Sequence, residues 1–291
     1  MITFNKMYKR IGGFILKDIS FTIPDGCICG MVGRNGAGKT TILNLLLGLM
    51  NPDMGQITID NMSYANREKE IRELLGFVIV DDLFIAQISP KENGKYYGKY
   101  YDSYDNEMYL ELLDRFGIKG RKCFGKLSRG QKLKCQFAFA LSVKPKYLIL
   151  DEPTANFDPD FHKDFWKLLS EFVADEKHSV LLATHLTDEL DRMADKLLYV
   201  DEGQIIYEGD MEDFRSRYRV LSGDISLLKK IERKYVLDIY EGKYSTTALV
   251  GKDASYSDEL VSSSPTIEDF MIHFQHGKEL GYYGTYEEAM R

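Results

Sequence analysis

The chain of 291 residues is poor in cysteine and carries no excess of positive charge. Its four cysteines are Cys27, Cys29, Cys123 and Cys135. Their spacing fits neither a zinc site nor a disulfide framework, and reduced thiols are typical of the cytosol. Acidic residues outnumber basic ones by 45 to 38, which gives a net charge of −7 and argues against a nucleic-acid-binding protein.

Long hydrophobic runs are also missing. Residues 1–6 lack the apolar core of a signal peptide. No run approaches the roughly 20 apolar residues that a membrane-spanning helix needs. If the protein works at a membrane, we therefore expect another chain to supply the membrane part.

A glycine-rich segment near the start of the chain carries the strongest signal. Residues 33–40 read GRNGAGKT and match the phosphate-binding pattern G-x-x-x-x-G-K-[ST]. The glycines let backbone amides turn inward around a phosphate, while Lys39 neutralises phosphate charge and the Thr40 hydroxyl binds Mg²⁺. A buried strand (28–32) and an apolar helix (41–49) are predicted on either side, so the helix N-terminus faces the phosphates. The predicted nucleotide-binding residues here are Gly33, Asn35, Gly36, Ala37, Gly38, Lys39, Thr40 and Thr41.

Two carboxylates close a second buried strand, residues 147–152. Asp151 is placed to bind Mg²⁺, usually through water. Glu152 is placed to orient and polarise a water that attacks the γ-phosphate. An ordinary acidic strand end is the alternative, and the preceding phosphate-binding loop favours the catalytic interpretation.

Strands alternate with helices through most of the first 210 residues, which indicates a largely parallel sheet with ligands at the carboxyl ends of its strands. Residues of about 82–146 instead have tyrosines, lysines and acids at helical spacing and read as a helical insertion. Its aromatics form either a partner surface or ordinary packing: Tyr96, Tyr97, Tyr100 and Tyr101.

The predicted fold is therefore α/β. It has a P-loop NTPase core with a parallel sheet, an N-terminal antiparallel β part, an inserted helical subdomain and a small α+β C-terminal region. We expect an ATPase domain over 1–209 and an accessory region over 210–291, with strands at 235–240 and 244–250 and a helix start at Thr266.

A third motif, residues 127–131, reads LSRGQ and opens a predicted helix. Ser128, the amide of Gly130 and the helix dipole form an anion site. With this motif the chain resembles the nucleotide-binding subunit of ATP-binding cassette (ABC) transporters over about residues 1–210. The signature pentapeptide of that family is usually Leu-Ser-Gly-Gly-Gln, and this chain has Arg129 at the third position.

The resemblance implies further site residues. Ser128, Arg129, Gly130 and Gln131 would meet the nucleotide held by an opposite subunit. Asp158 matches the acid of the loop that contacts that subunit. His185 matches the switch histidine at the γ-phosphate, which gives Glu152, His185 and Lys39 as the catalytic set.

One family position departs from the pattern. After residues 76–79 the family has Gln, which touches Mg²⁺ and the lytic water, whereas this chain has Val80. Valine cannot bind a metal. Asp81 substitutes through a one-residue shift, or the metal keeps an extra water; Gln87 is a more distant candidate.

The aromatic that stacks on adenine in this family has two candidates. Tyr8 resembles it, ahead of the first strands. Phe14 is the rival, and either ring could instead only pack.

The resemblance also implies how the protein works. A head-to-tail homodimer or heterodimer would sandwich two ATP molecules with Mg²⁺, close on binding and reopen on hydrolysis. It would act in the cytoplasm, on the inner face of the membrane, through integral permease subunits on a separate chain. Residues 264–270 resemble a segment of ABC-2-type exporter ATPases, a branch that includes exporters of peptides and antibiotics.

Two alternatives stand beside an exporter. A non-transport ABC ATPase acting on ribosomes or DNA usually has two cassettes or a long coiled-coil insertion, and this chain has one cassette. A regulatory switch would bind ATP without useful hydrolysis, against which Asp151, Glu152 and His185 together argue.

Overall fold

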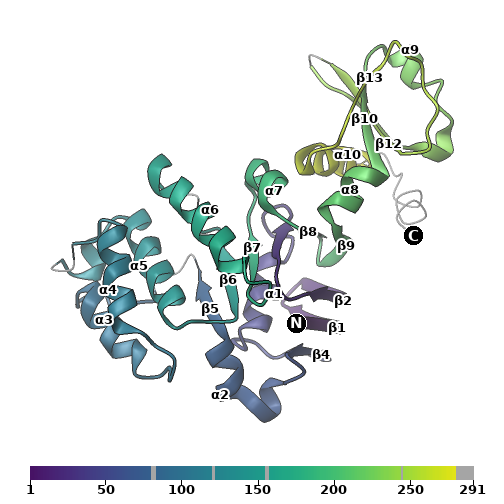
Figure 1. The fold of residues 1–291 in the computed structure, drawn as a ribbon. Coiled ribbons are helices and arrows are strands. Elements are labelled where there is room, and N and C mark those ends of the chain that lie inside the picture. Colours follow the sequence, from purple (N-terminus) through teal and green to yellow (C-terminus); the bar gives the residue numbers. More distant parts are fainter. Residues whose placement is uncertain (80–82, 120–121, 155–156, 244, 280–291) are drawn as a thin grey trace. The chain divides into compact units, whose positions relative to one another are not determined.

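The computed structural model describes residues 1–79, 83–119, 122–154, 157–243 and 245–279. The chain forms two compact units (Figure 1). The first unit contains residues 1–185 and 198–206. The second contains residues 186–197 and the chain from Tyr207 onward. Val80, Asp81 and Asp82, which include the predicted metal ligand Asp81, lie outside the described residues.

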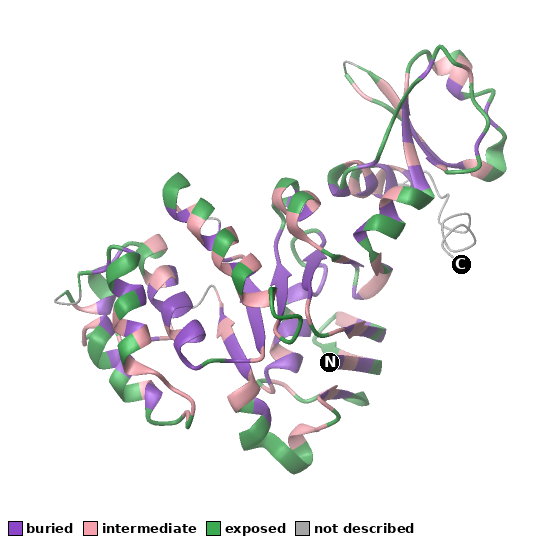
Figure 2. Ribbon diagram, in the orientation of Figure 1, coloured by how far each residue is buried: buried purple, intermediate pink, exposed green. Residues whose placement is uncertain are grey.

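A six-stranded sheet forms the centre of the fold, in the order β5-β6-β7-β3-β8-β9. Its strands are β5 (Leu75–Val78), β6 (Tyr147–Asp151), β7 (Ser179–Ala183), β3 (Ile28–Val32), β8 (Lys196–Asp201) and β9 (Gln204–Asp210). The neighbours β5, β6, β7 and β3 run parallel. Every residue of β3, β6 and β7 is buried, as expected for strands covered on both faces (Figure 2). The predicted parallel sheet is confirmed.

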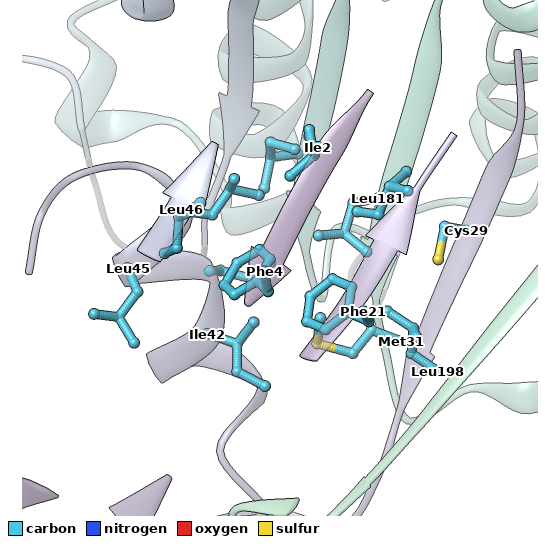
Figure 3. Packing of buried hydrophobic residues seen from close by; sticks show 14 of the residues in the cluster. Ile2, Phe4, Phe21, Cys29, Met31, Ile42, Leu45, Leu46, Leu181 and Leu198 are labelled. Atoms are coloured by element: carbon cyan, nitrogen blue, oxygen red, sulfur yellow. The ribbon is translucent and has the colours of Figure 1, made fainter. Parts of the chain in front are cut away.

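An antiparallel sheet of three strands packs over the first helix of the first unit. Its strands are β1 (Ile2–Ile11), β2 (Phe14–Ile23) and β4 (Met54–Ile59), in the order β2-β1-β4. Phe4 and Phe21 stack with ring centroids 4.3 Å apart. They share a buried cluster with Ile42 of α1 (Lys39–Leu46) and Leu181 of β7 (Figure 3). This cluster holds α1 between the two sheets, as the predicted antiparallel part requires.

Helices make up the rest of the first unit. They are α2 (Tyr64–Leu74), α3 (Pro90–Gly98), α4 (Asn106–Arg115), α5 (Arg129–Ser142) and α6 (Pro159–Val173). Local sequence sets where several begin: Ser89 and Glu92 form a capping box before α3, and Asp105 caps α4. Between 83 and 146 the described residues form helices and no strand, in agreement with the predicted helical insertion.

The tyrosines of the helical insertion differ in how far they are buried. The rings of Tyr97 and Tyr101 lie against Phe139 of α5, with centroids 6.5 and 5.9 Å away. Tyr96 and Tyr100 are instead 43% and 62% exposed. The inner pair therefore packs, and the outer pair belongs to the surface.

The second unit is a four-stranded antiparallel sheet with helices. Its strands run in the order β11-β12-β10-β13 and are β10 (Tyr218–Ser222), β11 (Val236–Glu241), β12 (Thr246–Gly251) and β13 (Val261–Ser263). Its helices are α7 (Thr187–Met193), α8 (Met211–Arg217), α9 (Ile225–Leu228) and α10 (Ile267–Glu279). The strands β11 and β12 and the start of α10 were predicted; β10, β13 and α8 were not.

Asp191 binds α7 to α10 within the second unit. Both of its carboxylate oxygens accept a hydrogen bond from the Ile267 amide at 3.1 Å. Burial raises the pKa of the Asp191 carboxyl. Thr266 and Asp269 form the predicted reciprocal cap before α10. Thr266 Oγ1 donates to Asp269 Oδ2 at 2.7 Å, and the Asp269 amide donates to Thr266 Oγ1 at 3.0 Å.

No helix among the described residues is both long and apolar enough to cross a membrane.

We predict that Phe137→Ala destabilises the first unit by about 3–5 kcal/mol, the usual result of removing a buried aromatic ring. Phe137 is fully buried on α5, and its ring centroid lies 5.0 Å from that of Phe165 on α6. Urea unfolding measures the change, with Tyr96→Ala as the exposed control, expected within about 0.5 kcal/mol of the parent. Equal losses in the two variants would contradict the packing described here.

Candidate functional site

Three motifs that are far apart in the sequence meet at one edge of the central sheet. Gly33 follows β3, Asp151 ends β6, and Thr184 follows β7. Because these strands are parallel neighbours, their carboxyl ends lie side by side. A cavity of about 500 Å³ opens there, lined by Ile11, Phe14, Arg34, Asn35, Gly36, Gly38, Lys39, Thr40, Thr41, Asp151 and Glu152.

The loop of residues 33–40 needs glycine for two physical reasons. Gly36 and Gly38 have φ angles of +82° and +116°, in the region that side chains disfavour. A β-carbon on Gly38 would also lie 2.7 Å from Leu16 Cδ2 and 3.0 Å from Phe14 Cζ. Gly38 is the N-cap of α1, so the amides of the first helical turn face the cavity end of the loop. This arrangement suits an anion.

Lys39 is a buried cation that spans the loop. Its Nζ donates to the carbonyl of Gly33 at 2.6 Å and to that of Arg34 at 3.3 Å. Burial lowers the pKa of the Lys39 ammonium, and the nearby carboxylates of Glu152 and Asp151 act in the opposite direction. The ammonium is thus held beside the cavity where a phosphate charge would be neutralised.

Thr40 and Asp151 supply hard oxygen atoms next to the loop. Thr40 Oγ1 donates to Asp151 Oδ2 at 3.0 Å, and Asp151 is buried. Oxygen ligands of this kind suit Mg²⁺, which is usually held by one or two protein side chains together with phosphates and water. No cluster of three or more His, Cys, Asp or Glu side chains in the described ranges could hold a metal by itself. The paired oxygen atoms of Thr40 and Asp151 fit a Mg²⁺ ion whose other ligands are phosphates and water.

Glu152 is fixed in an unusual backbone conformation beside the cavity. Its φ is +46°, which is rare for a residue with a side chain and is found disproportionately at active sites. The Glu152 amide donates to the Ala183 carbonyl at 2.8 Å. Its Oε2 lies 2.8 Å from His185 Nδ1 and accepts from Thr184 Oγ1 at 3.2 Å. The structure thus joins the predicted base directly to the predicted switch histidine.

The signature motif, residues 127–131, begins α5 as predicted. Ser128 caps the helix: its Oγ accepts from the Gln131 amide at 3.3 Å, and Gln131 Oε1 accepts from the Ser128 amide at 3.1 Å. Arg129 and Gly130 form the first turn. None of these four is among the described residues that line the cavity of their own chain. They lie together at the N-terminal end of α5, a surface distinct from the lining of that cavity.

Asp158 links that surface to the loop that follows Glu152. Its Oδ1 caps α6 by accepting from the Phe161 amide at 3.0 Å, and its Oδ2 pairs with Lys134 Nζ of α5 at 2.6 Å. The bond to Lys134, and to a lesser extent the one from the Phe161 amide, holds the pKa of the Asp158 carboxyl below its usual range. Sequence reasoning missed Lys134, because nothing local marks a helical lysine whose partner depends on how α5 and α6 pack.

The structure separates the two candidates for an adenine-stacking aromatic. Phe14 lines the cavity and lies beside Gly38. Tyr8 lies on β1, paired with Met54 of β4, and is not among the described residues that line the cavity. Ile11, which the sequence analysis did not select, also lines it. An aliphatic residue at a strand end has no distinctive pattern that would have revealed it.

These features define a P-loop nucleotide-hydrolysing protein, and comparison with known proteins gives its family. The ABC transporter family model matches residues 16–155. The chain is 34% identical over 214 residues to the Nod factor export ATP-binding protein I of Burkholderia lata, which covers 72% of this chain and 70% of that protein. It is 30% identical to the bacitracin transport ATP-binding protein BcrA of Bacillus licheniformis, over 69% of this chain and 66% of that protein.

A solved structure shares the fold. It is a dimeric ATP-binding cassette in a post-hydrolysis state with ADP and Pi, with a TM-score of 0.65 and 23% identity over 72% of this chain and 99% of that one. The chain belongs to the ABC transporter family of ATP-binding proteins. It is an ATPase.

We predict that Gly38→Ala lowers the affinity for ATP by about tenfold or more, equivalent to about 1.4 kcal/mol. The reason is the strained φ and the two close contacts of the added β-carbon. Calorimetric titration with ATP measures the change. Gly13→Ala is the matched control, since a β-carbon at Gly13 meets no described atom within 4 Å. An unchanged affinity in Gly38→Ala would show that the loop tolerates the side chain.

Proposed function

We propose that this chain is the ATPase subunit of an exporter, driven by ATP-dependent closure of a dimer. The observation that carries the proposal is the meeting of Lys39, Asp151 and the Glu152–His185 pair around one phosphate-sized loop. A relative named for Nod factor export supports export as the direction of movement, and one named for bacitracin transport supports a role in transport. A peptide or antibiotic-like cargo is the corresponding proposal.

Hydrolysis would use residues that the structure already brings together. Thr40 and Asp151 would hold Mg²⁺, which neutralises charge on the β- and γ-phosphates. Glu152 would orient the attacking water and accept its proton. His185, 2.8 Å from the Glu152 carboxylate, would keep that carboxylate aimed and meet the γ-phosphate. Lys39 would bind the phosphates through its ammonium. Asp81 as a further metal ligand stays a prediction.

The base of the nucleotide would pack against Phe14 at the open side of the cavity. Phe14 lies beside Gly38 of the loop, and its ring offers a flat apolar face. Ile11 would add apolar contact on the same side. We therefore prefer Phe14 to Tyr8 for this role.

The second half of each site would come from another subunit. Ser128 to Gln131 are grouped at the start of α5, away from the residues that line their own chain's cavity. A solved cassette of the same fold is dimeric. In our proposal a second subunit presents this helix end to the γ-phosphate, and the Lys134–Asp158 pair keeps the helix and the loop before α6 moving together. This chain carries both halves, so a homodimer is sufficient; a heterodimer would use the same surfaces.

Membrane coupling follows from the proposed exporter role. Permease subunits on a separate chain would hold the ATPase dimer at the cytoplasmic face of the membrane and select the cargo. The rival, a soluble ATPase acting on ribosomes or DNA, lacks comparable support, because the relatives described above are named for export and transport.

We predict that Glu152→Gln keeps ATP affinity within about threefold of the parent but lowers hydrolysis by about a hundredfold or more, the usual effect of losing a general base. The variant should also accumulate as a dimer in ATP, measured by light scattering after size exclusion. Glu171→Gln, on the exposed side of α6, is the control and should hydrolyse normally. Lys39→Ala should weaken ATP binding itself. A native hydrolysis rate in Glu152→Gln would refute the assignment of the base.

We also predict that the full-length protein co-purifies from detergent-solubilised membranes with a multi-span membrane protein encoded beside it. Mass spectrometry of the purified complex identifies that partner, and purification from the soluble fraction of the same cells serves as the comparison. Recovery with ribosomal proteins or DNA, and with no membrane protein, would favour the soluble rival.

A further inference from the structure

A second cavity lies wholly within the C-terminal unit. Its volume is about 530 Å³, within the range of small-molecule sites. Part of its wall is apolar, formed by Ile231, Val236 and Ile239. Every lining residue comes from the stretch 228–276, which belongs to the second compact unit, whereas the residues around the phosphate loop belong to the first. The cavity is therefore separate from the nucleotide site.

The charges around this cavity favour an anion. Lys229, Arg233 and His276 line it together with one carboxylate, Glu241. The lining thus has two permanent cations and one carboxylate, and the buried Asp238 carboxylate behind it is already engaged by His273 and His276. Arg233 also donates from Nη1 to the Val236 carbonyl at 3.0 Å, which fixes the guanidinium near the wall.

His276 is held in place at the cavity wall by a buried carboxylate. Its Nδ1 lies 2.9 Å from Asp238 Oδ1, and Asp238 is 0% exposed. The ring of Tyr240 packs edge-on against the imidazole, with centroids 5.2 Å apart. Because Nδ1 is committed to the carboxylate, Nε2 is the ring atom that can meet a ligand.

Structural need alone does not account for this second imidazole. The same Asp238 carboxylate already contacts His273 Nδ1 at 2.9 Å, and His273 Nε2 in turn lies 3.1 Å from Thr247 Oγ1. That chain of bonds by itself ties α10 to β11 and β12. His276 adds a partly exposed imidazole on the cavity side, with a fixed orientation.

We propose that this cavity binds an amphipathic anion, a small molecule with an apolar body and one acidic group. The apolar body would lie against Ile231, Val236 and Ile239. The acidic group would be met by Lys229 and Arg233, and by the Nε2–H group of His276 when the imidazole carries both protons. The inference does not depend on the ATPase mechanism, since the two sites share no residue.

Calorimetric titration of the full-length protein with decanoate, below its micelle-forming concentration and with ADP present, tests the proposal. Decanoate should bind. Decanol, which has the same chain length but no charge, should bind with an affinity at least about tenfold lower. Arg233→Gln and His276→Gln should each weaken decanoate binding by about tenfold. Lys234→Gln is the matched control: Lys234 is exposed, pairs with Glu232 and does not line the cavity.

Lys229→Gln keeps the test decisive if the Arg233 or His276 variant fails to fold, because Lys229 is exposed at the rim. It should also weaken decanoate binding, and its thermal unfolding should match that of the parent. Absence of decanoate binding would overturn the proposal. Equal binding of decanol, or binding unchanged in the lining variants, would overturn it as well.

Discussion

The register of three parallel strands is the constraint on which the catalytic part of this protein depends. Asp151 of β6 lies opposite Ala183 of β7, and Ala183 lies opposite Met31 of β3. Hydrogen bonds then continue past the strands: the Glu152 amide donates to Ala183, and the Thr184 amide donates to Met31. A shift by one residue would move the loop, the carboxylates and the histidine apart. The buried, fully paired strands keep the site preorganised before any nucleotide arrives.

Charged side chains near this edge of the sheet are compensated in two places. Inside the cavity, the buried Lys39 ammonium lies near the carboxylates of Asp151 and Glu152, so neither sign is left uncompensated. Outside it, Asp158 pairs with Lys134 and joins the signature helix to the segment that follows the proposed base. In the proposed dimer, a shift near Glu152 of one site could therefore reach the signature helix that the same subunit would present to the other site.

In the C-terminal unit, too, single carboxylates hold several groups in place. One buried carboxylate, Asp238, orients two imidazoles, and Asp191 joins α7 to α10. Because α7 begins two residues after His185 and the unit itself begins at Leu186, this unit starts next to the residue that we assign to the γ-phosphate. The accessory region is therefore joined through the backbone to the residue that would contact the nucleotide. A ligand bound in its cavity would influence that residue through the same connection.

Local chemistry in the sequence was enough for several features. The phosphate loop, the buried strands on either side of it, and the caps at Ser128 and Thr266 all depend on residues within a few positions of one another. Family resemblance supplied the roles of residues that no local pattern could assign, His185 among them. The short strands β10 and β13 escaped prediction, because three exposed residues or a strand directly after a helix give no clear period.

Only the folded chain decided which distant groups meet. It placed Phe14 rather than Tyr8 at the cavity, brought Glu152 Oε2 to His185, and paired Lys134 with Asp158. It also assembled Asp238, His273 and His276 from β11 and α10, more than thirty positions apart. Motif identity is a property of neighbouring residues, which the sequence states directly. Contacts across a sheet or between helices depend on register and packing, which no short stretch of sequence contains.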